Sequence, residues 1–544
     1  MSRKGSQRAA SVVNIQSCRK QEGDCAGEAH FFGVFGKGLP MSMPFSGEEF
    51  TFTQPDGTAL RVRGWGDQHH AVFEALNGYT VVEDPITGFY VYADVSADGE
   101  ELLPTGARPR VADPQTLGLT RGVRVKREAA KAKAMESTIL PPGTSRWEVR
   151  RRRFKSALRS AAAAPGVIPA PPHRETVGDF IGLCLLIQFP DVPGTVNRDE
   201  VDAFCNRPGY TGFGNNGSVY DYFFDMSGGR LRYKNVVTPY YTAKHPRSYY
   251  TNEAISQPNR ARELIKEALF YFIDQGFDFK QLTVDNEHYI YATNVFYAGT
   301  RVNNWAKGLW PHSFHLLTPY ELAPGKKAYD YQITDMANEL SLGTFCHENG
   351  HMICDFPDLY DYGYESAGVG AFCLMCAGAN VNEKNPTQVN AYLKYRAGWA
   401  GSVTRIAAGL NATASARGNQ LFIHRKSQTE YFIIEARYKE GRDRALPGAG
   451  LAIWHVDELG DNQNEQMTAK RHYECSLEQA DGRYDLENDP RNYGDATDLF
   501  ASNVNGHFGA ETKPNSGWWD GTASGLDISA ISSASTEMTF IGNV

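Results

Sequence analysis

The segment His347-Glu348-Asn349-Gly350-His351 places two imidazoles and a carboxylate at a spacing that suits metal-dependent hydrolysis. On an α-helix, residues four apart lie one turn apart on the same face, so both histidines can bind a single Zn²⁺. Zinc lowers the pKa of a bound water toward about 7. The neighbouring Glu348 can accept the proton of that water and pass it to a leaving amine. We therefore expect His347 and His351 to be metal ligands and Glu348 to be the general base.

A catalytic zinc needs a third protein ligand, and several carboxylates follow His351 in the sequence. Pro357 should end the helix near Asp355, because the residue before a proline disfavours the helical conformation. Beyond this turn, Asp358 can come back toward the metal, and we expect it to be the third ligand. Asp355, Asp361, Glu365 and Glu383 are further candidates for this position.

Several other segments have patterns that predict the elements around this motif. Residues 334–352 have a helical composition, and residues 260–273 carry apolar side chains at a helical period. The run FIGLCLLIQF at 180–189 is apolar throughout, as expected of a strand buried on both faces. Further short strands are expected at 288–297, 316–320, 420–424, 431–438 and 450–456.

The part of the chain before residue 175 has two different compositions. Residues 48–114 contain short alternating segments separated by turn signals such as Asn77-Gly78, which predict a small antiparallel β unit. The early part of residues 120–175 could form a solvated helix. The rest, with a basic run at 150–153, an alanine run and several prolines, is typical of a linker. Two interpretations of this linker stay open. It is either a solvated spacer or a processing site between a pro-region and an enzyme.

These patterns predict an α+β chain with a small N-terminal β unit, a central domain built around the motif helix and a β-rich C-terminal domain. The central domain is expected to combine a mixed sheet with the active-site helix. The expected divisions are 1–45 (disordered), 46–120 (β-rich pro-region), 121–175 (basic Ala/Pro-rich linker), 176–402 (catalytic domain) and 403–544 (β-rich domain).

Composition excludes some classes of function. The 544 residues carry a net charge of −8, which does not suit a general nucleic-acid binder. No apolar run reaches the length of about 20 residues that a membrane-spanning helix needs. The first 25 residues are basic but lack a following apolar segment, so no secretory signal peptide is visible. Nine cysteines are present, and a disulfide is conceivable among Cys346, Cys354, Cys373 and Cys376.

The motif and its surroundings resemble the immune inhibitor A family of secreted bacterial metallopeptidases, which are metzincin-like zincins. The family pattern H-E-x-G-H-x-x-G-x-P-D-x-Y-D is matched by His347, Glu348, His351, Asp358 and the residues around them. Two departures are present. One extra residue precedes Asp358, and Cys354 or Asp355 stands where the family has a turning glycine. Further similar segments are 182–191, 217–229, 309–313, 369–375, 435–437, 450–457 and, in the pro-region, 54–58, 77–79 and 88–93.

The resemblance implies that the central domain is a zincin catalytic domain and that the N-terminal β unit is a pro-region. It further implies a secreted zinc endopeptidase that is made as a latent precursor and acts on polypeptides. It also implies that Met375 forms an apolar floor beneath the zinc. Calcium is a further ion that the resemblance allows, although no loop matches a recognised calcium spacing. His312 is expected to be a packed histidine and not a ligand. The alternative to an enzyme is a catalytically inactive zincin used for binding or adhesion. Candidates for the residue that maintains latency are Cys18, Cys25 and Asp56.

Overall fold

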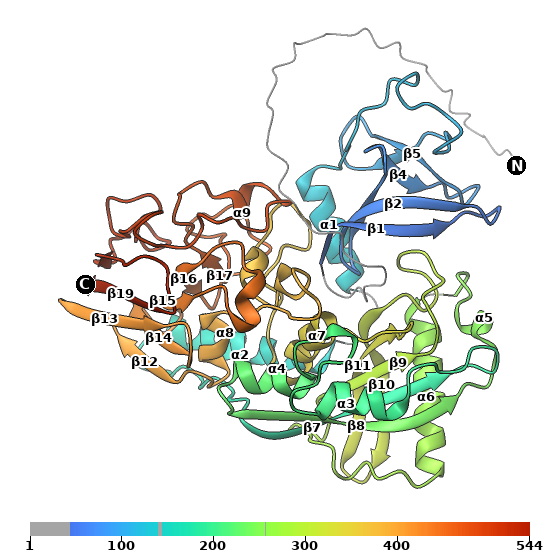
Figure 1. Ribbon diagram of the computed structural model, residues 1–544. Coiled ribbons are helices and arrows are strands. Elements are labelled where there is room, and N and C mark those ends of the chain that lie inside the picture. The colour runs from blue at the N-terminus through green and yellow to red at the C-terminus, as the bar shows by residue number, and fades with distance from the viewer. Residues whose placement is uncertain (1–43, 140–143, 256) are drawn as a thin grey trace, which may run out of the picture. The chain divides into compact units, whose positions relative to one another are not determined.

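The computed structural model describes residues 44–139, 144–255 and 257–544 (Figure 1). These residues form a mixed α+β structure with 21% helix and 29% strand. Within these ranges, no helix combines the length and apolarity that crossing a membrane requires. The prediction of disorder covers residues 1–45, of which only residues 44 and 45 are described. Cys18 and Cys25 also lie outside the described residues.

The first described unit is a six-stranded antiparallel sheet whose strands follow one another in chain order. Its turns occur at the predicted signals. Gly78, for example, adopts a φ of 82° between two strands, a conformation that favours glycine. Phenylalanine and tyrosine side chains fill one face of the sheet. The strands are β1 (Phe45–Thr53), β2 (Ala59–Gly66), β3 (Ala71–Ala75), β4 (Thr80–Glu83), β5 (Tyr90–Val95) and β6 (Leu102–Pro104).

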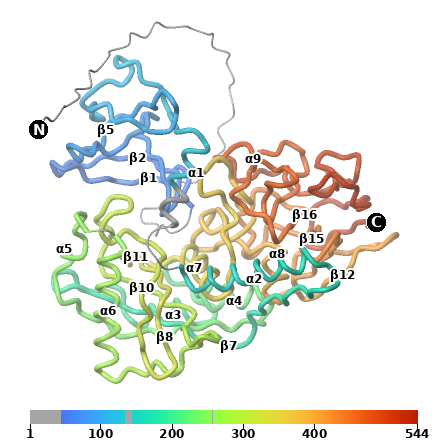
Figure 2. The backbone as a smooth tube through the Cα atoms, turned by 180° about the vertical axis from the view of Figure 1, so that it is seen from behind, coloured from blue at the N-terminus to red at the C-terminus, as the bar shows by residue number. Residues whose placement is uncertain are grey.

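Two helices follow where the sequence predicted a basic linker over 121–175. They are α1 (Arg127–Ile139) and α2 (Arg146–Ala163). The expectation of a solvated spacer is wrong for α2, which packs against the helix that carries the metal motif (Figure 2). The basic run that suggested a solvated segment supplies several of the ion pairs that hold α2 in place.

The arginines of α2 form ion pairs with acids far away in the sequence. Arg150 lies 3.1 Å from Asp285 and 2.7 Å from Asp355, and its own side chain is 15% exposed. Arg151 pairs with Glu474, which is nearly fully buried. These partners are more than 130 residues distant, so the local composition of the linker could not reveal them.

The central sheet has five strands in the order β10-β11-β9-β7-β8. Four of them pair in parallel, and the edge strand β10 is antiparallel to β11. The apolar run at 180–189 forms the interior strand β7, as predicted. Alternate residues of β7 enter two different cores, Cys184 and Leu186 on one face and Leu183 and Leu185 on the other. Helices therefore cover both faces, which explains why the run is apolar throughout. The strands are β7 (Gly178–Gln188), β8 (Leu231–Thr242), β9 (Thr293–Tyr297), β10 (His312–Ala323) and β11 (Lys326–Asp335).

The helices of the central part divide between these two cores. One core contains residues of α3, α4 and α7, and the other contains the apolar stripe of α6. Helix α6 confirms the helix predicted over 260–273. The helices are α3 (Arg198–Asn206), α4 (Val219–Met226), α5 (Arg247–Tyr250), α6 (Gln257–Asp274), α7 (Leu342–Cys354) and α8 (Ala391–Arg396).

The C-terminal part contains a five-stranded sheet in the order β12-β14-β15-β16-β17 and a three-stranded sheet in the order β13-β19-β18. Side chains of both sheets share one apolar core. The elements are β12 (Ser402–Arg405), β13 (Leu410–Ser415), β14 (Gln420–Arg425), β15 (Glu430–Arg437), β16 (Gly450–Asp457), β17 (Cys475–Leu477), α9 (Asp485–Asn488), β18 (Asp527–Ser529) and β19 (Glu537–Asn543).

Candidate metal centre

Helix α7 carries the two histidines of the motif on one face, and every residue of the helix is buried. Nε2 of His347 lies 3.1 Å from Nε2 of His351. The side chains are one helical turn apart, as the sequence predicted. Two imidazole nitrogens at this distance in a buried site can share a proton or hold a cation between them.

The carboxylate of Asp358 completes a triangle with these nitrogens. Its Oδ1 lies 3.1 Å from Nε2 of His347 and 3.2 Å from Nε2 of His351. Apart from these two imidazoles, the same oxygen has no hydrogen-bond partner among the described residues, although its side chain is only 9% exposed. The structure thus brings together the three residues that the sequence predicted as metal ligands.

The departure from the family pattern after α7 is accommodated by Asp355. This residue ends the helix in the left-handed conformation, with φ 56° and ψ 30°. Among residues other than glycine, Asp and Asn tolerate this left-handed region best. Its backbone N–H donates to the carbonyl of His351 at 3.0 Å. The chain then turns through Phe356 and Pro357, which brings Asp358 back to the histidines despite the extra residue.

The three ligand atoms fit a tetrahedral zinc ion. Zinc ligands at about 2.0–2.1 Å from the metal lie about 3.3 Å from one another, close to the spacing of this triangle. The other ring nitrogens are engaged in a way typical of metal-binding histidines. Nδ1 of His347 lies 3.0 Å from the Leu374 carbonyl, and Nδ1 of His351 lies 2.6 Å from the Phe356 carbonyl. With Nδ1–H donating, each Nε2 keeps its lone pair for the ion.

The electrostatics of the triangle also favour a cation. Burial lowers the pKa of His351, but the carboxylates of Asp358 and Glu348 outweigh burial and raise it to about 9. Burial raises the pKa of Asp358, but the two imidazoles overcome this and hold it well below its usual range. A negative carboxylate and a retained positive charge are therefore the favoured state of the site, and a metal ion can supply that charge.

Glu348 lies beside the triangle but is not part of it. The Ser313 hydroxyl of β10 donates to its Oε2, and its Oε1 has no partner among the described residues. The side chain is buried, with 2% exposure. An acceptor oxygen that no protein donor satisfies is available for the proton of a water, as the general-base prediction requires.

The glycine inside the motif is explained by close packing. A Cβ atom at Gly350 would lie 2.8 Å from Sδ of Met375, closer than real contacts allow. Met375 is fully buried, and its carbonyl accepts the N–H of Leu359 at 2.8 Å. Met375 therefore lies against the motif helix, and its role as an apolar floor beneath a zinc ion stays a prediction.

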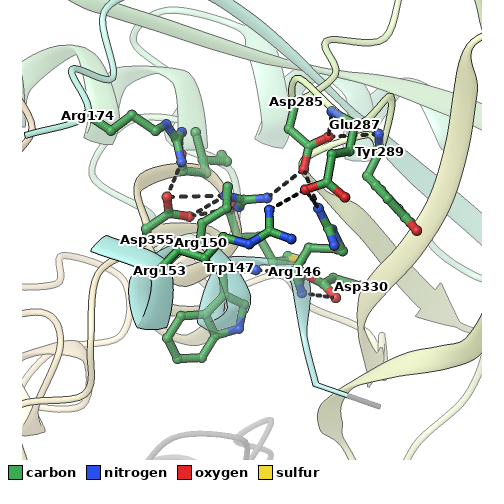
Figure 3. A network of polar contacts seen from close by, with 12 residues as sticks. Arg146, Trp147, Arg150, Arg153, Arg174, Asp285, Glu287, Tyr289, Asp330 and Asp355 are labelled. Atoms are coloured by element: carbon green, nitrogen blue, oxygen red, sulfur yellow. Dashed lines mark hydrogen bonds and ion pairs between the residues drawn. The ribbon is translucent and has the colours of Figure 1, made fainter. Parts of the chain in front are cut away.

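The remaining candidates for the third ligand lie outside the triangle. The carboxylate of Asp355 is held by Arg150 and Arg174, which come from α2 and from the segment after it (Figure 3). Both arginines also donate to the final carbonyls of α7, those of Met352 and Ile353. The other acids and His312 also make separate contacts: Asp361 and Glu365 group with Glu465, Glu383 is half-buried outside the triangle, and His312 bonds Trp310 and Tyr331.

Sequence reasoning did not identify Trp147 as part of the site. Its ring stacks on the ring of His351, with centroids 4.5 Å apart and planes at 25°. The carboxylate of Asp330 accepts the backbone N–H groups of Arg146 and Trp147 at the start of α2. Figure 3 shows the indole pointing away from the ion pairs of Arg150 with Asp285 and Asp355. A lone Trp in a basic segment gave no signal of this role.

A loop between β2 and β3 also reaches the site. The Gln68 carboxamide accepts the N–H of Ser313 at 2.9 Å and donates to its carbonyl at 3.3 Å. Beside it, Asp67 is fully buried and accepts the Tyr360 hydroxyl at 3.1 Å. Asp56, which the sequence suggested as a latency residue, instead lies on an exposed turn and pairs with Arg108. The residues of the six-stranded unit that contact Ser313 and Tyr360 are thus in the β2–β3 loop.

The cysteines around the motif carry free thiols. All seven described cysteines are unpaired and buried. Burial raises the pKa of Cys346, Cys354 and Cys376 above the usual value, so these thiols are poorly reactive apolar side chains.

Comparison with models of known protein families and with curated proteins found no match.

Proposed function

We propose that this chain is a zinc-dependent endopeptidase made as a latent precursor. The observation that carries the proposal is the triangle of His347, His351 and Asp358, in which one buried carboxylate oxygen lacks any other described partner. Glu348 lies next to this triangle with a free acceptor oxygen. The arrangement of three ligands and an adjacent base is that of a hydrolytic zinc site.

The residues of the chain have separate roles in this proposal. Zinc, when bound, supplies an acidified water and polarises the carbonyl of the scissile bond. Glu348 takes the proton of the water through Oε1 and delivers it to the leaving nitrogen. The Ser313 hydroxyl holds the other carboxylate oxygen in place. Met375 and Gly350 keep the helix seated, so that both histidines face the same point.

An extended polypeptide can bind along β10, because this strand is at the edge of the central sheet. Ser313 is paired with Gln332 on β11, yet its N–H and carbonyl both bond the Gln68 carboxamide. Both groups therefore point to the open edge, as in the non-hydrogen-bonded pairs of antiparallel strands. A carboxamide with one donor and one acceptor reproduces the hydrogen bonds of a substrate peptide group there.

Latency follows from the same contacts. Gln68 takes the hydrogen-bonding groups that a substrate would use, and Trp147 covers one face of the His351 ring. The two residues come from the six-stranded unit and from α2, on either side of residues 125–145. A cut within 125–170 is therefore expected to raise peptidase activity, because it separates the six-stranded unit that carries Gln68 from the edge of β10.

The test is casein hydrolysis by the cut chain together with zinc content of the same sample. We expect one zinc per chain, activity that a chelator abolishes, and a loss of about 10²–10⁴-fold in Glu348→Gln with zinc retained. Bound zinc without hydrolysis would instead support the alternative of an inactive zincin used for binding. Equal activity before and after the cut would remove the latency part of the proposal.

A further inference from the structure

A second group of acids lies close to the metal triangle but is separate from it. Asp361, Glu365 and Glu465 each place a carboxylate oxygen within 4.8 Å of the other two. Two of them follow Asp358 on the same loop, and Glu465 comes from the segment after β16. Asp361 is fully buried, Glu365 is 4% exposed, and the Glu465 side chain is 7% exposed. Three carboxylates so close together and so well shielded from water need compensation.

The hydrogen bonds of the group leave part of this requirement unmet. Asp361 accepts from the N–H of Gly363 at 3.1 Å and from the Ser366 hydroxyl at 3.0 Å. Oε2 of Glu365 and Oε2 of Glu465 accept no hydrogen bond from any described residue. Buried carboxylate oxygens without a donor are costly, and both belong to this acidic group. They are the direct indication that a ligand belongs here.

One described ion pair reaches the group. Nζ of Lys131 on α1 lies 3.9 Å from Oε2 of Glu465, too far for a hydrogen bond. One ammonium facing three carboxylates leaves an excess of negative charge. Burial, with the neighbouring acids, accordingly raises the pKa of Asp361 to about 6 and that of Glu365 to about 8. Without a second cation, part of the group stays protonated at neutral pH.

We propose that Asp361, Glu365 and Glu465 form a binding site for a hard divalent cation such as calcium, which Lys131 partly occupies in the uncut chain. The ligands are all oxygens, and oxygen ligands prefer calcium and magnesium to zinc. Calcium tolerates irregular geometry and completes its shell with carbonyls and water, whereas magnesium demands a near-ideal octahedron. The involvement of Lys131 rests on the proposed function, because it assumes a precursor that is cut.

The site would join processing to the metal centre. Asp361 lies three residues after Asp358, so a cation held there ties the loop of the third zinc ligand to Glu465. Lys131 precedes α2, and a cut between them allows the lysine to leave with the six-stranded unit. Calcium would then replace a single positive charge with a double one and fix the loop in the cut enzyme.

The experiment is calorimetric titration of the zinc-loaded chain with calcium chloride alone. We expect weak binding by the uncut chain, and binding about tenfold tighter or more by both the cut chain and uncut Lys131→Met. Glu365→Gln and Glu465→Gln, each tested in the cut chain, should lose this binding, because each removes one charge from the ligand set. Asp495→Asn is the matched control. It lies in a second acidic group whose described carboxylate oxygens all have partners or solvent access, and it should leave calcium affinity unchanged.

Equal calcium affinity in cut wild type and cut Glu365→Gln would overturn the site. Equal affinity in uncut wild type and uncut Lys131→Met would overturn the role of the lysine. Calorimetry does not measure the peptidase activity of the chain, so the two proposals can fail separately. Calcium binding without casein hydrolysis would keep the cation site and reject the peptidase, and hydrolysis without calcium binding would do the reverse.

Discussion

The hydroxyl of Tyr362 donates a 2.8 Å hydrogen bond to Oδ2 of Asp358. This bond fixes the carboxylate so that its other oxygen, Oδ1, faces the two imidazoles. We expect Tyr362→Phe to bind zinc about 10–100-fold more weakly, because partners that orient a metal ligand contribute on this scale. Competition with a chromogenic chelator measures the affinity.

Tyr364→Phe is the matched control for this prediction. Its hydroxyl lies on the same loop and has no hydrogen-bond partner among the described residues. Removing that hydroxyl should leave zinc affinity unchanged. If the two variants bind zinc equally well, Asp358 does not depend on Tyr362 for its orientation.

Gln68 is expected to restrain the uncut chain by bonding both backbone groups of Ser313. Gln68→Ala removes these bonds and frees the edge of β10 for substrate. We expect the basal casein hydrolysis of the uncut variant to rise several-fold, while the activity of the cut form stays at the wild-type level. A continuous fluorogenic-casein assay before and after the cut gives both values.

The control is Gln54→Ala in the same sheet. The Gln54 carboxamide bonds the backbone of Tyr90 at both ends and is buried. This variant weakens the six-stranded unit without altering the contacts of Ser313. Equal activation by both variants would mean that loosening the unit, and not the loss of the Gln68 contact, releases activity.

Local patterns in the sequence predicted the parts of the site that depend on short stretches of chain. The spacing in α7 placed His347 and His351 on one face, and Pro357 marked the turn that brings in Asp358. The sequence could not show how the turn is made without glycine. Asp355 takes the left-handed conformation, and its side chain is held by arginines 181 and 205 residues away. Such long-range pairs leave no periodic signal.

The same limit explains why the linker prediction was wrong. A run of arginines with alanines is typical of a solvated segment when its partners are unknown. Here the partners are buried acids from three distant segments, so charge that suggested exposure holds α2 against α7. Trp147, at the start of this helix, could be connected with His351 only once α2 was placed.

Arg150 tests how much these pairs contribute to stability. It bridges Asp285 and Asp355 and donates to the Met352 carbonyl. Arg150→Met keeps most of the side-chain volume but leaves two buried carboxylates with one arginine partner fewer. We expect the free energy of unfolding to fall by about 3 kcal/mol, the low end for a broken buried pair, since other arginines still reach each acid. Chemical denaturation measures the change.

Arg152→Met provides the comparison, because Arg152 is exposed on the same helix and its hydrogen bond to the Thr144 hydroxyl is long, at 3.4 Å. Its effect should stay within about 0.5 kcal/mol. Equal destabilisation by the two variants would show that α2 is held by its helical packing and not by the Arg150 ion pairs.

Glu474 makes the attachment of α2 dependent on pH. Its side chain is 3% exposed and lies 2.7 Å from Nζ of Lys155, and Arg151 also contacts it. Burial raises the pKa of Glu474, but Arg151, Lys155 and Arg396 outweigh burial and lower it to about 2. An unfolded glutamate has a pKa of about 4.3. Because the folded value is the lower one, this carboxylate stabilises the fold fully above about pH 5 and loses that contribution as pH falls toward 2.

Glu474→Gln should therefore be less stable than wild type at pH 6, by about 3 kcal/mol, and the difference should shrink toward zero near pH 2. Denaturation midpoints of both proteins at several pH values measure it. Glu287→Gln is the control, since Glu287 also pairs with arginines of α2 but is 43% exposed, and exposed pairs contribute about 0–1 kcal/mol. A difference between wild type and Glu474→Gln that stayed constant from pH 6 to pH 2 would assign the stabilisation to packing, since a contribution from the ionised carboxylate must disappear when that carboxylate is protonated.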